Sequence, residues 1–287
     1  DKPFFLYLAF SAAHTPIAPH ENFQGKTTVG RYGDYVYEMD YHIGRVLNAL
    51  DSLGIAKNTV VIFSSDNGGV NEDGLKYSSA VGALTKNYGH NSSGILNGIK
   101  SDALEGGHRM PFIVRYPGHV KENAISDALI SQVDMMATFA ALSGAKLANN
   151  AGEDSFNMLP LFEGKQKNVR SSLVVQSGEG ILSLQDRKWK LILCSGTGGK
   201  LGRGSSVGHL PVREIQDGKP VWKNVQLFDL ENDIGEKHNL AAENPKKVKE
   251  MMQILKEYII HGRSTKGEPL EDGKLELWPE VQWVKSF

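Results

Sequence analysis

The chain has 287 residues, of which 40% are hydrophobic and 23% are charged, and these values are ordinary for a globular protein. Its 32 basic and 33 acidic residues give a formal net charge of −1, so composition provides no electrostatic attraction to nucleic acid or to an anionic membrane. The single cysteine, Cys194, excludes a disulfide within the chain and a thiolate metal site. No apolar stretch approaches the ~20 residues that span a bilayer.

The first sixty residues carry the pattern of a strand, a helix and a second strand. The sequence starts without methionine and enters an apolar run at once, so we expect a piece of a longer protein. Residues 4–10 are predicted to form a buried strand. Apolar side chains then recur at helical spacing over residues 35–53, and Gly54 suits the C-cap. The four apolar residues 60–63 predict a strand buried on both faces, which completes the βαβ pattern of a parallel sheet.

Polar side chains follow both of these predicted strands. His14 comes after the first, and Asp66 and Asn67 come after the second, in the segment Ser-Ser-Asp-Asn-Gly-Gly. Ligands of open α/β sheets gather beyond the carboxyl ends of the strands, and hard cations such as Ca²⁺ and Mg²⁺ bind all-oxygen donor sets. The alternative is that Asp-Asn-Gly-Gly is only a good turn, and for this segment alone that interpretation is favoured.

The next segment is polar and leads to a charged cluster. Residues 71–98, which include His90, predict a long loop, and loops of this length in compact domains are usually functional or disordered. Lys100 follows, and then the run Glu-Gly-Gly-His-Arg at 105–109. A third strand is predicted over residues 111–116, and a helix over 131–143.

The pattern of apolar segments changes after a small polar connector at residues 146–152, where we place a domain boundary. The predicted domains are therefore residues 1–150 and 151–287. The second has short apolar segments and one long amphipathic pattern, which predict strands at 172–175, 181–184, 188–194 and 225–230 and a helix at 245–260. This pattern is typical of a small antiparallel α+β domain. The glycine-rich residues 196–206 match no phosphate-binding pattern and predict a surface loop.

Two of these polar groups follow predicted strands, His14 and the Asp66-Asn67 pair. Lys100 precedes the third predicted strand. An imidazole, a divalent cation and an ammonium group at one edge would suit a dianionic tetrahedral group, as in sulfate and phosphate esters. Each residue also has a plain alternative: a loop histidine, a turn and a solvated lysine.

Five motifs in order resemble the type I sulfatases of the alkaline phosphatase superfamily. They are Ala-His-Thr-Pro at 13–16, the helix at 35–53, Ser-Asp-Asn-Gly at 65–68, Lys100 with Glu-Gly-Gly-His-Arg, and Leu-Phe-Asp-Leu at 227–230 with Glu236 and Asn239. The resemblance implies an α/β domain whose mostly parallel sheet is sandwiched by helices and whose N-terminal part is missing here, followed by the small antiparallel domain.

The resemblance also implies roles for these residues. Asp66 and Asn67 would bind the divalent cation, usually Ca²⁺ in this family, with Mg²⁺ as the alternative. Lys100 would contact a sulfate oxygen, and His14 would bind the sulfate and help to protonate the leaving alcohol. His90 would face the substrate, as a loop histidine does in carbohydrate sulfatases of this kind.

The family's nucleophile is a formylglycine made within a Cys/Ser-x-Pro/Ala-x-Arg motif, and no such motif occurs in these 287 residues. Cys194 is followed by Ser-Gly-Thr-Gly and cannot replace it. We therefore expect the nucleophile in an upstream segment, and no turnover by this chain alone.

The implied substrate is a sulfated small molecule or glycan, and the implied location is extracytoplasmic, periplasmic or secreted. Two rival functions remain open. One is a phosphodiester or phosphonate monoester hydrolase of the same superfamily, and the other is a non-catalytic relic that binds sulfated glycan.

Overall fold

The computed structural model describes residues 2–75, 80–199, 208–270 and 277–287. Contacts between residues divide the chain into two compact units. The first unit consists of Asp1–Thr59 with Gly69–Gly94, and the second of Val60–Gly68 with Ile95–Phe287. Among the described helices, none is long and apolar enough to cross a membrane.

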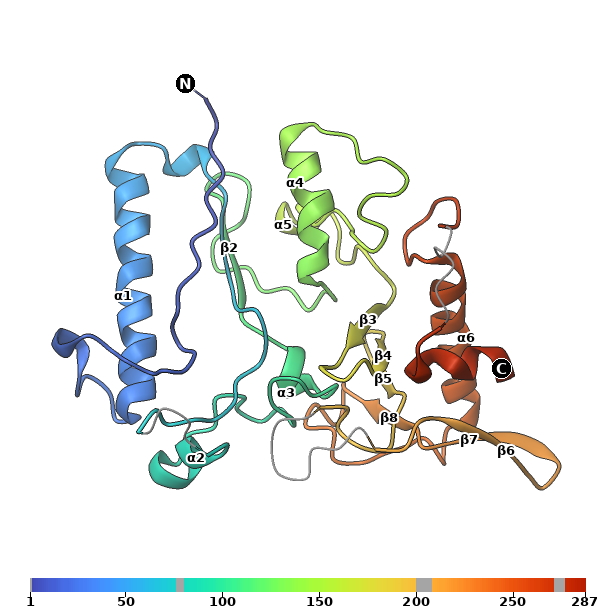
Figure 1. The fold of residues 1–287 in the computed structure, drawn as a ribbon. Coiled ribbons are helices and arrows are strands. Elements are labelled where there is room, and N and C mark those ends of the chain that lie inside the picture. Colours follow the sequence, from blue (N-terminus) through green and yellow to red (C-terminus); the bar gives the residue numbers. More distant parts are fainter. Residues whose placement is uncertain (1, 76–79, 200–207, 271–276) are drawn as a thin grey trace. The chain divides into compact units, whose positions relative to one another are not determined.

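The first unit is built around one long helix, α1 (Gly30–Ser52), drawn in blue in Figure 1. The predicted helix is confirmed, although it begins five residues earlier than the apolar spacing indicated. Buried Asp34 fixes the preceding loop, because its carboxylate accepts hydrogen bonds from the backbone N–H of Gly25 at 2.7 Å and of Thr27 at 2.8 Å. The shorter elements of this unit are η1 (Glu21–Phe23), η2 (Ala56–Asn58) and α2 (Ala83–Tyr88).

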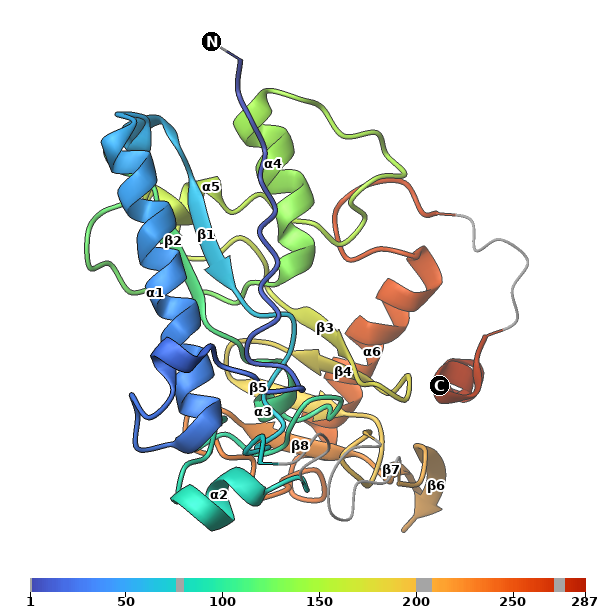
Figure 2. The same ribbon diagram turned by 60° about the vertical axis from the view of Figure 1, so that its left-hand side comes forward.

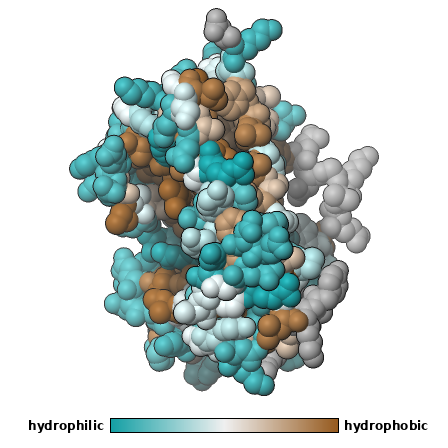
Figure 3. All heavy atoms as spheres, turned by 90° about the vertical axis from the view of Figure 1, so that its left-hand side faces the viewer, coloured by the Kyte–Doolittle hydropathy of each residue, from teal (hydrophilic) through white to brown (hydrophobic). Residues whose placement is uncertain are grey.

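The strand predicted at residues 4–10 is wrong: the segment belongs to none of the described sheets. Its large side chains are exposed, 60% for Phe4 and 82% for Tyr7. An apolar run becomes a buried strand only where other elements cover both its faces, and here solvent reaches these side chains. On the face drawn in Figure 3, apolar side chains, in brown, reach the surface among polar ones.

The second unit begins with a two-stranded sheet of β1 (Val61–Ser64) and β2 (Phe112–Arg115). Both strands were predicted, but they pair antiparallel, with Val61 opposite Arg115 and Ser64 opposite Phe112. The prediction of a mostly parallel sheet is therefore not confirmed among the described strands. A run of apolar residues favours a strand of a parallel sheet, but it does not determine the direction of the neighbouring strand.

The same unit contains four short helices, of which α3 (Glu105–His108) lies between β1 and β2 and the others follow β2: η3 (Gln132–Asp134), α4 (Met135–Ser143) and α5 (Leu159–Phe162). The helix predicted over residues 131–143 is confirmed by η3 and α4. It ends as predicted at Gly144, whose φ of 72° is the left-handed conformation favoured at a C-cap.

A four-stranded antiparallel sheet forms the core of the second unit. Its order is β3-β4-β5-β8, and its strands are β3 (Leu173–Gln176), β4 (Leu182–Gln185), β5 (Trp189–Ile192) and β8 (Gln226–Asp229). The amphipathic helix α6 (Pro245–His261) packs on it through fully buried Met252 and Leu255, and η4 (Pro279–Ser286) adds Val281. Figure 2 shows the sheet and α6 in yellow and orange. The predicted antiparallel α+β arrangement of these segments is confirmed.

One hairpin was not predicted, and it is formed by β6 (Val212–Gln216) and β7 (Lys219–Lys223). Gln216 pairs with Lys219, so Asp217 and Gly218 form a two-residue turn with φ values of 51° and 70°. Asp-Gly is a strong signal for such a turn, and it was present in the sequence. Of the predicted glycine-rich loop, residues 200–206 lie outside the described residues.

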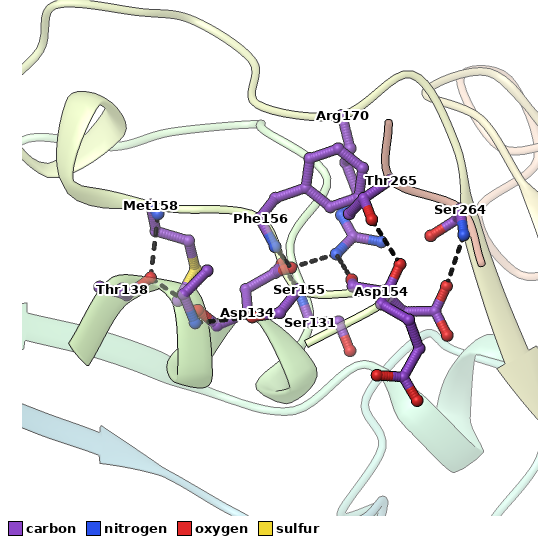
Figure 4. Close-up of polar contacts among 12 residues, drawn as sticks. Ser131, Asp134, Thr138, Asp154, Ser155, Phe156, Met158, Arg170, Ser264 and Thr265 are labelled. Carbon is purple, nitrogen blue, oxygen red and sulfur yellow. Dashed lines mark hydrogen bonds and ion pairs between the residues drawn. The ribbon is translucent and has the colours of Figure 1, made fainter. Parts of the chain in front are cut away.

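A buried ion pair links the two sides of the connector at 146–152. Asp134 is fully buried and pairs with Arg170, and its carboxylate also accepts the backbone N–H of Phe156 at 2.9 Å (Figure 4). The Arg170 guanidinium lies 4.5 Å from the centroid of the Phe156 ring. The predicted division into residues 1–150 and 151–287 stays a prediction.

Candidate functional site

The loop after β1 presents the two predicted cation ligands. Asp66 is exposed, and within the described part of the chain its Oδ1 accepts one long hydrogen bond, of 3.4 Å, from the Ser65 hydroxyl. The Asn67 amide nitrogen donates to the Gly68 carbonyl at 2.9 Å. Because this bond uses the nitrogen, the amide oxygen is the end of Asn67 that can bind a cation.

This loop packs backbone to backbone against the turn that follows Lys100. The N–H of Gly68 donates to the carbonyl of Gly107 at 2.9 Å. A Cβ atom on Gly68 would lie 1.8 Å from the Gly106 carbonyl oxygen, so only glycine allows this approach. A second backbone hydrogen bond holds this turn, since the N–H of Gly106 donates to the carbonyl of Asn97 at 2.6 Å. The loop with Asp66 and the loop with Lys100 are therefore brought together.

Lys100 itself is half-buried in the loop between residues 97 and 105. Within the described residues its ammonium group has no ion-pair or hydrogen-bond partner. The loop is held by buried Asp102, whose carboxylate accepts the N–H of Ile99 at 3.0 Å. A positioned ammonium group without a carboxylate partner is suited to an external anion.

A buried charge cluster lies directly behind this turn and consists of Glu105, Lys190 and Glu236. The Lys190 ammonium is 2.9 Å from Glu105 Oε1 and 3.2 Å from Glu236 Oε1. The other oxygen of Glu236 accepts the N–H of Glu105 at 2.6 Å and so satisfies the N-terminus of α3. All three side chains are at most 4% exposed. The cluster thus ties α3 to β5 and to the segment after β8.

Burial shifts the titration of the groups in and beside this cluster. Burial alone would raise the pKa of Glu105, but the charges of Lys190 and Arg109 outweigh it, and the pKa is lowered. Burial raises the pKa of Glu236 to about 7, despite Lys190. Burial and, to a smaller extent, the positive charge of Lys190 lower the pKa of His108 to about 4.

Lys190 was not predicted as a site residue, and Glu105 was identified only as part of the Glu-Gly-Gly-His-Arg motif. The available signal was a lysine inside an apolar strand, because a buried lysine needs an acidic partner. The partners could not be identified from the sequence, since Glu105 lies 85 residues away.

His14 and His90 belong to the first unit, whereas Asp66, Asn67 and Lys100 belong to the second. Both histidines are exposed; His14 Nδ1 lies 2.7 Å from the Thr15 carbonyl, and the His90 ring is 6.2 Å from that of Tyr32. The predicted convergence of the histidines on the other site residues stays a prediction.

The donor set for a cation is incomplete in the described part of the chain. That part contains no group of three or more His, Cys, Asp or Glu side chains that could hold a metal ion. Asp66 and Asn67 supply two oxygens, whereas Ca²⁺ takes six to eight. An exposed carboxylate beside an amide oxygen fits a hard cation as one part of such a set.

Comparison with known proteins gives consistent matches. A family model described as Sulfatase matches residues 1–145. An N-acetylgalactosamine-6-O-sulfatase of Bacteroides thetaiotaomicron is 36% identical over 255 residues, which are 89% of this chain and 47% of that protein. Human arylsulfatase A is 29% identical over 262 residues, 90% of this chain and 48% of that protein. The chain thus spans about half the length of these curated relatives.

Solved structures agree with these matches. One, from work on the metabolism of multiple glycosaminoglycans by Bacteroides thetaiotaomicron, has a TM-score of 0.74 and 35% identity, and the match covers 90% of this chain and 50% of that one. Another, Ps i-CgsB in complex with k-i-k-neocarrahexaose, has a TM-score of 0.64 and 28% identity, with 89% and 50% covered.

Proposed function

This chain belongs to the sulfatase family, and we propose that its protein is a sulfuric ester hydrolase with Asp66, Asn67 and Lys100 in the sulfate site. The observation that carries the proposal is the contact between Gly68 and Gly107, 2.9 Å from nitrogen to oxygen. Through it, one compact unit joins the two oxygens proposed to bind the cation to the loop of Lys100, whose ammonium group has no partner among the described residues.

Each of these groups has a chemical task in the proposed reaction. Asp66 and Asn67 would hold a divalent cation, Ca²⁺ before Mg²⁺, which neutralises charge on the transferring group when bound. The Lys100 ammonium would stabilise charge on a sulfate oxygen. His14 would bind the sulfate and give a proton to the leaving alcohol, and His90 would contact the rest of the substrate.

The nucleophile in this proposal is a formylglycine from outside these 287 residues, because no Cys/Ser-x-Pro/Ala-x-Arg motif occurs among them. The alkaline-phosphatase-like α/β fold expected for the complete domain is supported by the structural neighbours.

We further propose a carbohydrate sulfate as the substrate, located outside the cytoplasm. Support comes from relatives of this chain, an N-acetylgalactosamine-6-O-sulfatase among the curated proteins and a neocarrahexaose complex among the solved structures. The loops around the sulfate site, rather than the cation site, would select the sugar.

The test uses the protein produced in its natural source, both as the parent and as the Lys100→Ala variant. Each is assayed on a 6-O-sulfated hexosamine and on an aryl phosphodiester. Loss of one anion-stabilising group should lower kcat for the sulfate ester about 10²-fold or more. Lys86→Ala is the matched control, because Lys86 is exposed on α2. Equal rates for Lys100→Ala and the parent, or faster cleavage of the phosphodiester, would overturn the proposal.

A further inference from the structure

A cavity of about 530 Å³ lies beside the β6–β7 hairpin, and none of its lining residues belongs to the candidate sulfate site. Its wall is formed by both hairpin strands, by residues 239–249 around the start of α6, and by Phe287. All of these residues belong to the second unit. The volume is in the range of pockets that bind small organic ligands.

The charged side chains that line this cavity are all cations, Arg213, Lys223 and Lys249, and no Asp or Glu is among its described lining residues. Lys223 and Lys249 are exposed and have no ion-pair partner within the described residues. Arg213 donates to the Ser286 carbonyl at 3.2 Å. The chain as a whole carries a net charge of −1, so this concentration of positive charge is local and not a consequence of composition.

Apolar and aromatic groups complete the lining. Buried Val225 and Val248 contribute apolar surface. The Trp222 ring is stacked on Phe287 with centroids 5.7 Å apart and lies at 84° to the Trp283 ring, so its orientation is fixed. A rigid indole offers a large apolar surface for the C–H face of a sugar ring at low entropic cost. The side-chain amides of Gln216 and Asn224 add hydrogen-bonding groups for hydroxyls.

From this lining we propose that the cavity is an accessory binding site for a sulfated oligosaccharide, separate from the site that would cleave the ester. Three cations on β6, β7 and α6 suit a ligand whose anionic groups are spread along a chain, and the aromatic surface suits its sugar rings. The choice of a sulfated glycan over other polyanions rests on the proposed function. The accessory site would hold a long substrate while the sulfate site acts elsewhere on it.

The test is titration calorimetry of the protein with a chondroitin 6-sulfate hexasaccharide, with the unsulfated hexasaccharide as comparison. We expect Lys223→Ala/Lys249→Ala to weaken binding about fivefold, since two exposed charge contacts are lost. The effect should vanish in 1 M NaCl, where the Debye length is about 3 Å. Lys246→Ala is the matched control on the same helix, because Lys246 is exposed and does not line the cavity. The affinity of this variant for the sulfated hexasaccharide should stay within twofold of the parent.

A Trp222→Leu variant tests the aromatic contact independently and should weaken binding of the sulfated hexasaccharide as well. Measurements in a Lys100→Ala background separate the two proposals, because the effect of Lys223→Ala/Lys249→Ala should persist there. Unchanged affinity of that double variant, equal binding of the unsulfated hexasaccharide, or an equal loss in Lys246→Ala would overturn the accessory site. None of these outcomes would affect the proposed hydrolysis.

Discussion

At the scale of single residues, the closest approach in the candidate site is at Gly68. Its replacement by alanine would place a Cβ atom 1.8 Å from a backbone oxygen, which cannot rotate away as a side chain can. We predict that Gly68→Ala lowers the free energy of unfolding by about 1–3 kcal/mol, because the two site loops must separate. Chemical denaturation measures this change.

Gly44→Ala is the control for this prediction. Gly44 lies inside α1 and has no atom within 4 Å of an added Cβ. This substitution should stabilise the protein by about 0.5–1 kcal/mol through helix propensity. If Gly68→Ala is as stable as the parent, the backbone contact does not hold the loops together.

Lys190 is the residue on which the buried cluster depends. Its removal in Lys190→Met would leave Glu105 and Glu236 buried without their shared cation. We expect a loss of about 3–5 kcal/mol in the free energy of unfolding, measured by urea titration at neutral pH. The half-buried neighbour on the same strand hairpin, Lys188, provides the comparison: its ion pairs lie near the surface, so Lys188→Met should cost less than about 1 kcal/mol.

Glu236 gives the stability a specific dependence on pH. Its pKa is about 7 in the folded protein against a usual 4.5, so the folded state holds this proton over a range where the unfolded chain has released it. The contribution of this group to stability is therefore present below pH 4.5 and is lost as pH rises toward 7. His108 acts in the opposite sense, because its lowered pKa makes stability fall as pH drops from 6.5 toward 4.

The prediction compares the parent with Glu236→Gln, in which the amide oxygen can still accept the N–H of Glu105. The free energy of unfolding of the variant, relative to the parent, should rise between pH 5 and pH 8. His108 is present in both proteins, so its effect cancels in the difference. Denaturant titrations at the two pH values measure it, and a difference that stays constant would contradict the assignment.

At the scale of elements, predictions succeeded where the pattern is local. The helices at 35–53, 131–143 and 245–260 and the four strands of the sheet β3-β4-β5-β8 follow from apolar spacing and capping residues. The direction of β2 beside β1 does not follow from spacing, and the exposed segment 4–10 has the composition of a strand but lacks the surroundings of one. The Asp217-Gly218 turn was readable and was overlooked.

The same distinction applies to the candidate site. Asp66, Asn67 and Lys100 were identified from motifs, and the Gly68 contact places their loops together. The cluster behind them joins residues from three distant parts of the sequence, so no local pattern could have predicted which carboxylates pair with Lys190.

At the scale of the whole molecule, the 287 residues contain proposed groups for binding a cation and a sulfate but no motif for the formylglycine nucleophile. An ammonium group and a cation stabilise charge but do not supply the attacking atom. We therefore predict that a chain of these 287 residues, purified alone, gives no turnover of an aryl sulfate above the buffer rate. The contrary outcome is hydrolysis that Lys100→Ala abolishes, because this would require a nucleophile within the chain. Hydrolysis unchanged by Lys100→Ala would instead indicate a contaminating enzyme, which mass spectrometry of the sample would detect.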